Sequence, residues 1–220
     1  MPNKFDIDKA VKLLRKEVVK WKTPIVTKYS KTKKRPAFKV LVSCLLSLRT
    51  RDEQTAEASK RLFAIADTPA KIAALPADKI EKLIYPVGFY RTKAKSIKEA
   101  CKTIVEKYHG KTPDTIEELL TLKGAGRKTA NLVVTLGFNK PGICVDTHVH
   151  RISNIWGYVE TKTPEKTEFA LREKLPTQYW IEYNDLLVTL GQNQCKPTSP
   201  ICSTCLLNEI CPQKGVLRSR

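Results

Sequence analysis

The sequence predicts an all-α protein with about ten helices. Apolar residues recur at intervals of three and four along most of the 220-residue chain, as they do on one face of a helix. Residue types that commonly cap helices stand at the start of several of these segments. No segment alternates apolar and polar residues strongly enough to predict a β-strand. The chain is therefore expected to consist of helices joined by turns, with no internal repeat and no low-complexity linker.

The first part of the chain carries four helix signals. An apolar stripe steps by four, three, four and three through Ile7, Val11, Leu14, Val18 and Trp21. Pro36 precedes the nearly all-apolar run AFKVLVSCLLS, which is longer than a typical strand and predicts a buried helix. Asp52 is expected to cap the helix that follows, and Asp78 is expected to cap a short one.

The middle of the chain predicts two helices on either side of a glycine-rich turn. A further helix, earlier in the chain than these two, is indicated by apolar residues at helical spacing, namely Ile97, Cys101, Ile104 and Tyr108. Thr115 with Glu118 three residues later forms a capping box in front of IEELLTL. The segment RKTANLVVTL then predicts a helix that begins directly after the glycines of residues 124–126.

The last part of the chain predicts three more helices. Asp146 is placed to cap the segment VHRISNIW. Thr163 and Pro164 introduce EKTEFALREKL, with proline at the first helical position, where its missing N–H costs nothing. Residues 179–191 are expected to be helical as well.

The charge of the chain points to a polyanionic partner. Forty Lys and Arg residues face 22 Asp and Glu residues, a formal net charge of +18. Residues 1–40 hold 13 of the basic residues and 3 of the acidic ones, so more than half of the excess lies there. Nucleic acid is the commonest partner of so basic a protein. An acidic membrane surface is the rival, but the apolar stripe of the first helix is explained more simply as facing a core.

The chain shows no sign of export or membrane insertion. No apolar run approaches the ~20 residues that span a bilayer, and the N-terminus lacks the apolar segment of a secretory signal. We therefore expect an intracellular protein with no membrane association. Disulfides are unexpected there, so the seven cysteines need another explanation.

The glycine turn is the first candidate functional motif. The stretch TLKGAGRKTANLVV lacks the spacing of a phosphate-binding P-loop, and a helix rather than a strand precedes it. Glycines at 124 and 126 allow positive φ and close backbone approach. The N–H groups at the start of the second helix favour an anion. The pattern is that of a helix-hairpin-helix, which grips a DNA phosphate without reading bases, although a plain αα-hairpin remains an alternative. The DNA-binding candidates are Leu122, Lys123, Gly124, Ala125, Gly126 and Arg127.

The second candidate is a group of four cysteines near the C-terminus. They are spaced by six, two and five residues, at Cys195, Cys202, Cys205 and Cys211. Thiols this close in an intracellular chain predict a metal site, and both zinc and a [4Fe–4S] cluster accept four cysteines. The other cysteines fall on apolar stretches and are expected to be buried thiols, namely Cys44, Cys101 and Cys144.

Together these motifs resemble the endonuclease III family, the bifunctional DNA glycosylases of the helix-hairpin-helix-GPD superfamily. The resemblance rests on LKGAGRKTANLVV, on GFNKPGICVDTHVHR with its aspartate, and on the cysteine spacing, and it extends from about residue 36 to Cys211. It implies a six-helix domain over residues 25–138. It also implies an iron–sulfur cluster domain formed by residues 1–24 and 139–220.

The resemblance assigns a chemical role to several residues. Lys128 falls on the family's nucleophile, Asp146 falls on its catalytic aspartate, and the four cysteines fall on its [4Fe–4S] ligands. The implied activity is base excision repair of double-stranded DNA, in which oxidised pyrimidines leave through a lysine Schiff base. The strand is then cleaved 3′ to the abasic site by β-elimination. Lys128 and Asp146 would face each other from different domains across a DNA-binding cleft.

Two further positions match residues that act when the damaged base leaves the helical stack. Arg49 falls on the position that fills the resulting hole, and Phe89 on the position that wedges the duplex. Arginine departs from the family's commoner glutamine, which puts the preference for the opposite base in doubt. A second departure is the cysteine loop, where Lys196 and Glu209 cancel, so that the basic N-terminal forty residues are expected to take up some of the phosphate contacts.

Two rival interpretations stay open from the sequence. A monofunctional adenine-mismatch glycosylase of the same superfamily would lack lysine at position 128 and would carry a further C-terminal domain. A non-catalytic, cluster-bearing DNA-binding module would not need both Lys128 and Asp146. The resemblance favours a monomeric enzyme over both. His148 and His150 are expected to be structural.

Overall fold

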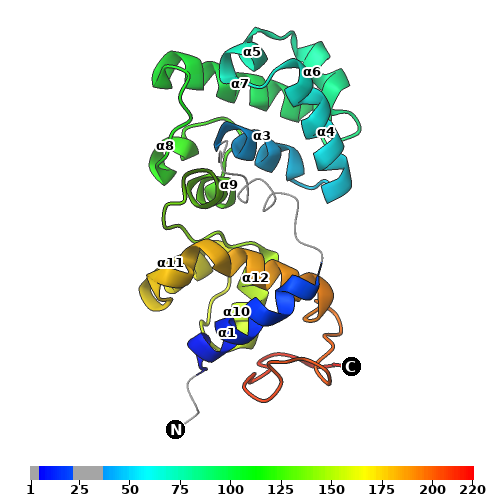
Figure 1. The fold of residues 1–220 in the computed structure, drawn as a ribbon, viewed down its shortest axis with the longest axis vertical. Helices are drawn as coiled ribbons and strands as arrows, with labels where there is room; N and C mark the ends of the chain where they lie inside the picture. The colour runs from blue at the N-terminus through cyan, green and yellow to red at the C-terminus, as the bar shows by residue number, and fades with distance from the viewer. Residues whose placement is uncertain (1–4, 22–36) are drawn as a thin grey trace. The chain divides into compact units, whose positions relative to one another are not determined.

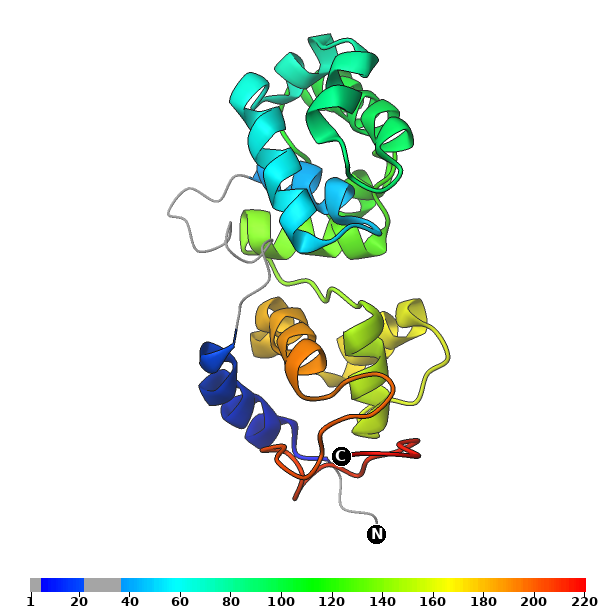
Figure 2. The same ribbon diagram turned by 90° about the vertical axis from the view of Figure 1, so that its right-hand side faces the viewer.

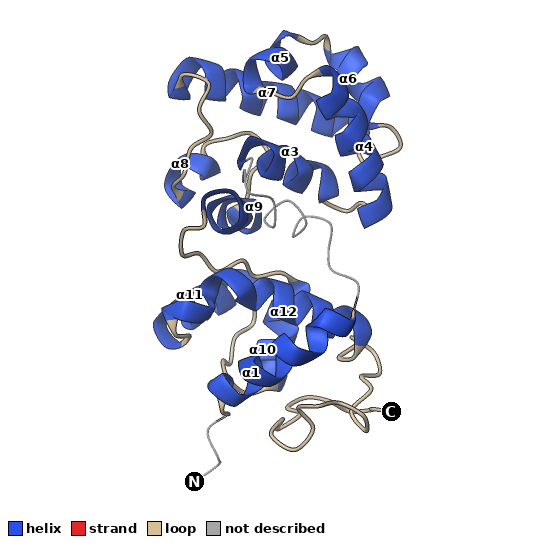
Figure 3. Cartoon of the chain, in the orientation of Figure 1, coloured by secondary structure: helices blue, strands red, loops and turns tan. Residues whose placement is uncertain are grey.

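The computed structural model describes residues 5–21 and 37–220, and every regular element within these residues is a helix or helical turn (Figure 3). The all-α prediction is confirmed. None of the described helices is both long and apolar enough to cross a membrane. Residues 1–4 and 22–36, which include Pro36 and seven of the thirteen basic residues of the first forty, lie outside the described ranges.

The described residues divide into two compact units, one containing residues 37–142 and the other residues 5–21 and 143–220. The helices of the first unit run in chain order (Figure 1): α3 Ala37–Ser47, α4 Asp52–Ile65, α5 Pro69–Ala74, α6 Ala77–Ile84, α7 Tyr90–Tyr108, α8 Ile116–Leu120 and α9 Arg127–Leu132. The helices of the second unit are α1 Ile7–Glu17, α10 Thr147–Ile155, α11 Pro164–Lys174 and α12 Trp180–Asn193. Short 3-10 turns follow α1 and precede α12, at Val18–Lys20 and Thr177–Tyr179.

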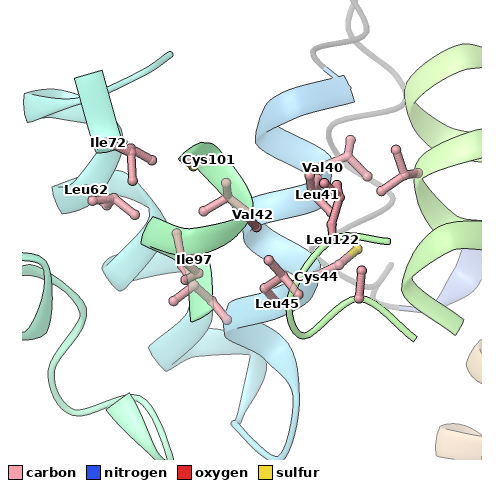
Figure 4. Packing of buried hydrophobic residues seen from close by; sticks show 14 of the residues in the cluster. Val40, Leu41, Val42, Cys44, Leu45, Leu62, Ile72, Ile97, Cys101 and Leu122 are labelled. Atoms are coloured by element: carbon pink, nitrogen blue, oxygen red, sulfur yellow. The ribbon is translucent and has the colours of Figure 1, made fainter. Parts of the chain in front are cut away.

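Helix α3 forms the centre of the first unit. Its residues 40–46 are all buried, and it packs against α4, α7 and α9. Figure 4 shows Leu45 and Val42 of α3 among side chains of the neighbouring helices, including Ile97 of α7. A helix that is apolar on all sides must be surrounded by other elements, which confirms the interpretation of AFKVLVSCLLS as a buried helix.

The second unit has its own apolar core, into which α1 directs one face. Ile7, Val11 and Leu14 of the predicted stripe are buried, and α1 packs against α12. Helix α10 contacts both α11 and α12. The largest fully buried side chains of this unit are Trp156, at the end of α10, and Tyr183 of α12. The stripe of the first helix therefore faces a core. After α12 the chain continues to the C-terminus without a further helix (Figure 2).

Three of the predicted helix caps are confirmed. Thr115 accepts a hydrogen bond from the backbone N–H of Glu118 at 3.3 Å. Thr163 accepts one from Lys166 at 3.2 Å, with Pro164 at the first helical position of α11. Asp146 caps α10. Each contact joins residues two or three positions apart, which is why the sequence alone reveals it.

Two other predicted caps are wrong. The N-cap of α4 is Arg51, and Asp52 is the first helical residue. The N-cap of α6 is Pro76, and Asp78 lies inside the first turn. An acidic side chain is favourable anywhere in the first turn because of the helix dipole, so its presence there does not identify the cap.

The helix predicted over RKTANLVVTL does not stay regular. It begins as α9 and becomes a π-helical turn over Val133–Gly137. The hydroxyl of Thr135 donates to the carbonyl of Asn131 at 2.9 Å, which competes with the regular backbone pattern. A Cβ atom at Gly137 would lie 2.9 Å from Cα of Ala37, so only glycine permits this approach to the start of α3.

Candidate functional site

The glycine turn between α8 and α9 is a compact hairpin. The N–H of Ala125 donates to the carbonyl of Leu122 at 3.0 Å, and both of these side chains are buried. Lys123, Gly124 and Gly126 are exposed. The helix-hairpin-helix arrangement predicted from the sequence is therefore present. Two buried apolar side chains anchor the turn, and its glycines are exposed.

The two glycines of the hairpin differ in backbone conformation. Gly124 has a φ of +84°, a conformation that side chains other than glycine rarely adopt, so the prediction holds there. Gly126 has a φ of −99° and so does not use the positive φ that glycine allows. A Cβ atom at Gly126 would meet nothing within 4 Å. This N-cap of α9 therefore presents its backbone without any side chain in front of it, which suits the approach of an anion.

Lys128 is exposed in the first turn of α9, two residues after this cap. Burial raises the pKa of the Cys44 thiol on α3 to about 12, and the neighbouring Lys128 charge opposes that rise. Cys44 therefore stays protonated at neutral pH and is a poor nucleophile. The exposed amine of Lys128 is the side chain of the two that can act as a nucleophile.

Asp146 is half-buried at the start of α10. Its Oδ1 accepts hydrogen bonds from the backbone N–H groups of His148 and Val149, both at 2.9 Å. These bonds fix the direction of the carboxylate. Asp146 belongs to the unit that contains α10, whereas Lys128 belongs to the unit that contains α3.

The two histidines near Asp146 make structural contacts, as expected. The Nδ1 atom of His150 lies 2.7 Å from Oγ1 of Thr167 on α11, and burial lowers the pKa of His150. The ring of His148 packs so closely on α12 that a Cβ atom at Gly191 would lie 2.3 Å from its Nδ1.

The four C-terminal cysteines line one pocket next to Leu190 and Leu207. Burial raises the pKa of Cys195 and Cys205, and it raises that of Cys211 to about 11, with mutual repulsion between the thiolates adding to each shift. Within the described residues, no three His, Cys, Asp or Glu side chains are arranged to hold a single metal ion. Cys44, Cys101 and Cys144 are buried thiols, as predicted.

Arg151 is a residue of this region that the sequence analysis missed. Its guanidinium lies 3.4 Å from the sulfur of Cys195 and donates to the carbonyl of the same residue at 2.6 Å. It thus ties α10 to the start of the cysteine loop. A lone arginine on a helix face gives no sequence signal for such a contact.

The cysteine loop is also more basic than its own sequence indicates. The C-terminal segment pairs with it, since the N–H of Arg220 donates to the carbonyl of Pro200 at 2.9 Å. Lys196 lines one pocket with Arg220 and another with Arg218. The C-terminal segment therefore adds positive charge beside the loop, which the balance of Lys196 and Glu209 in the sequence did not indicate.

Arg49 and Phe89 lie close together on the surface of the first unit. The Cζ atom of Arg49 lies 5.8 Å from the centre of the Phe89 ring. Phe89 is 65% exposed, so it does not pack in the core. Both residues have positive φ values, 53° and 58°. The structure brings together two side chains that the sequence places 40 residues apart.

The chain matches known proteins over most of its length. A family model described as HhH-GPD superfamily base excision DNA repair protein matches residues 42–177. Endonuclease III of Thermotoga maritima is 48% identical over 188 residues, which cover 83% of this chain and 88% of that protein. The chloroplastic endonuclease III homolog 2 of Arabidopsis thaliana is 45% identical over 184 residues, and the match spans 48% of that longer protein.

Solved structures of DNA glycosylases also match the chain. The structure of a trapped endonuclease III–DNA covalent intermediate, an estranged-adenine complex, matches with a TM-score of 0.83 and 31% identity over 97% of both chains. A thermostable thymine-DNA glycosylase, at 22% identity and a TM-score of 0.72, shares the fold.

Proposed function

The chain belongs to the HhH-GPD superfamily of base excision DNA repair proteins, and from this premise we propose that it is an endonuclease III-type DNA glycosylase with lyase activity. Its substrate is double-stranded DNA that carries an oxidised pyrimidine. The observation that carries the proposal is the exposed amine of Lys128 directly after the hairpin turn. A covalent protein–DNA intermediate, of the kind trapped for the matching endonuclease III, requires such a nucleophile.

In the proposed reaction, the neutral amine of Lys128 attacks C1′ of the damaged nucleoside. A bond forms between Nζ and C1′, and the bond from C1′ to the base breaks, so that the base leaves with a proton. Opening of the sugar ring gives an imine between Lys128 and C1′. The imine makes the C2′ proton acidic, and its removal expels the 3′ phosphate. Water then hydrolyses the imine and regenerates the lysine.

The hairpin is proposed to hold the DNA backbone beside this lysine. Leu122 and Ala125 anchor the turn in the core, while Lys123, Gly124 and Gly126 are exposed. The absence of a side chain at Gly126 leaves room for a phosphate at the start of α9. Such a contact positions the strand without reading its sequence, as a repair enzyme requires.

The four cysteines that line one pocket are proposed to hold a [4Fe–4S] cluster, which would fix the loop through iron–thiolate bonds. Four sulfur donors and no carboxylate or imidazole in the pocket suit iron–sulfur chemistry. The proposed cluster domain comprises residues 1–24 and 139–220, and the domain with the hairpin comprises residues 25–138. The protein is proposed to act as a monomer inside the cell.

Replacing Asp146 by asparagine should slow base release by about 10²-fold while affinity for DNA stays nearly unchanged. The carboxylate is proposed to stabilise positive charge on the sugar and to assist proton transfer. Asparagine caps helices as well as aspartate does, so the melting temperature should not change. Single-turnover excision, DNA binding and thermal unfolding of the variant test this role. An unchanged excision rate would show that Asp146 acts only as a helix cap.

The function itself is tested with duplexes that each carry one oxidised pyrimidine, one abasic site, one uracil or one mismatched adenine. We expect base release and strand cleavage together on the oxidised pyrimidine, with a covalent complex after borohydride reduction. Base release from the mismatch without cleavage would instead identify a monofunctional adenine glycosylase. Binding without any product would identify a non-catalytic module. Size-exclusion chromatography with light scattering on the same preparation tests the monomer.

A further inference from the structure

The loop that carries Arg49 and the turn that carries Phe89 approach each other closely. A Cβ atom at Gly88 would lie 2.7 Å from the carbonyl oxygen of Arg49, so only glycine permits the contact. Both Arg49 and Phe89 adopt the left-handed backbone conformation, which is unfavourable for a residue with a side chain. Two adjacent segments in this unfavourable conformation need contacts that hold them there.

Lys93 supplies these contacts. It lies in the first turn of α7, its backbone N–H donates to the carbonyl of Phe89 at 3.0 Å, and its side chain is buried at 8% exposure. The ammonium donates to the carbonyl of Leu46 at 2.6 Å, to the carbonyl of Leu48, and to Oγ1 of Thr50 at 3.0 Å. All three of its N–H groups are thereby used. Burial alone lowers the pKa of Lys93 to about 8, and these acceptors stabilise the charged form against that cost.

The acceptors belong to the end of α3 and to the Arg49 loop. The last carbonyl groups of a helix have no partner inside the helix, and they carry the negative end of its dipole. Leu46 lies in the last turn of α3, so a buried ammonium there satisfies a backbone group and interacts favourably with the dipole.

Thr50 completes the connection between the two segments. Its hydroxyl accepts from Lys93 and from the backbone N–H of Gly88 at 3.2 Å, and it donates to the carbonyl of Leu48 at 3.3 Å. The single donor and both acceptor positions of the hydroxyl are therefore filled. One network runs from the Arg49 loop through Thr50 and Lys93 to the Phe89 turn.

We propose that Lys93 is a positioning residue that joins the Arg49 loop and the Phe89 turn into one rigid surface, so that both side chains meet the DNA duplex together at the damaged base pair. This rests on the proposed function of the protein. Extruding a base from the duplex loses the free energy of its stacking on the neighbouring bases. Side chains that are already held in place can replace this stacking with a smaller loss of conformational entropy, because no further ordering is needed when DNA binds.

The test uses Lys93→Met, which keeps the aliphatic chain and removes the ammonium. Thr50→Val removes the hydroxyl with little change in shape, and it serves if Lys93→Met does not fold. The matched control is Lys98→Met, because Lys98 lies on the same helix and its ammonium also donates to a backbone carbonyl, that of Leu75 at 2.6 Å. Melting temperatures of all variants separate effects on stability.

Two readouts report the presentation of Arg49 and Phe89. The first is the fluorescence of 2-aminopurine placed opposite a tetrahydrofuran abasic analogue in duplex DNA, which rises when the orphaned base leaves the stack and requires no catalysis. The second is the ratio of excision rates for one lesion in duplex and in single-stranded DNA. We expect Lys93→Met and Thr50→Val to lower the fluorescence rise and to reduce the ratio by about tenfold. Lys98→Met should change neither.

The result must also depend on the side chains that Lys93 positions. In the Arg49→Ala, Phe89→Ala background, Lys93→Met should have no further effect on either readout. Equal loss on both substrates, or an undiminished effect in that background, would overturn the inference and leave Lys93 a structural residue. If Arg49→Ala, Phe89→Ala changes nothing, the surface has no role in base extrusion and the inference fails. If the wild-type protein excises no base, the proposed function fails, while the fluorescence comparison still decides the role of Lys93.

Discussion

Replacing Lys128 by glutamine is expected to reduce base excision by about 10⁴-fold or more and to eliminate the covalent complex trapped by borohydride. The glutamine amide has a similar reach but no nucleophilic lone pair on its nitrogen. Its N–H groups can still contact the DNA backbone, and the hairpin turn is unaffected. Affinity for damaged duplex should therefore fall by less than about tenfold, the effect of one lost cation.

The trapping reaction makes this result specific. Borohydride reduces only an imine, so a covalent band reports bond formation at C1′ rather than binding. Lys79→Gln on α6 is the matched control, since it removes an exposed lysine of the same unit outside the proposed site and should trap as the wild type does. Strand cleavage at the normal rate by Lys128→Gln would show that another group is the nucleophile.

Replacing Cys205 by serine is expected to remove the iron from the protein and to abolish DNA binding. The wild-type protein should be yellow-brown and carry about four irons per chain. The cysteine loop contains no helix, and Pro200 and Leu207 are its buried residues. Apolar burial therefore does little to order the loop, so its structure should depend on the metal–thiolate bonds. Its collapse would also displace Lys196 and the basic C-terminal segment paired with the loop.

Iron content, visible absorption and DNA binding measure this prediction. The matched control is Cys144→Ala, which removes a buried thiol of the same unit that does not line the pocket. It should retain full iron content, although it can lower the melting temperature. A colourless wild-type protein with one zinc ion per chain would contradict the iron–sulfur assignment.

Most of the features that the sequence predicted correctly depend on local contacts. The caps at Thr115, Asp146 and Thr163 join residues two or three positions apart, and the apolar stripe of α1 follows from helical geometry. The same local rules failed at Asp52 and Asp78, because the helix dipole favours acidic side chains throughout the first turn. The π-helical turn after α9 was missed since it accompanies the close approach of Gly137 to Ala37, a hundred residues earlier in the chain.

By itself, the sequence determined the helical class, the hairpin with Lys128 at the start of its second helix, and the clustering of four cysteines. These features rest on spacings of a few residues, and backbone geometry converts such spacings directly into positions on a helix or turn. Only the tertiary structure decided that Phe89 is exposed beside Arg49, that Arg218 and Arg220 lie next to Lys196, and that Lys93 is buried beneath the Arg49 loop. These contacts join segments that are far apart in the chain. Their free energy comes from burial and hydrogen bonding that no local pattern encodes, so they exist only once the helices have packed.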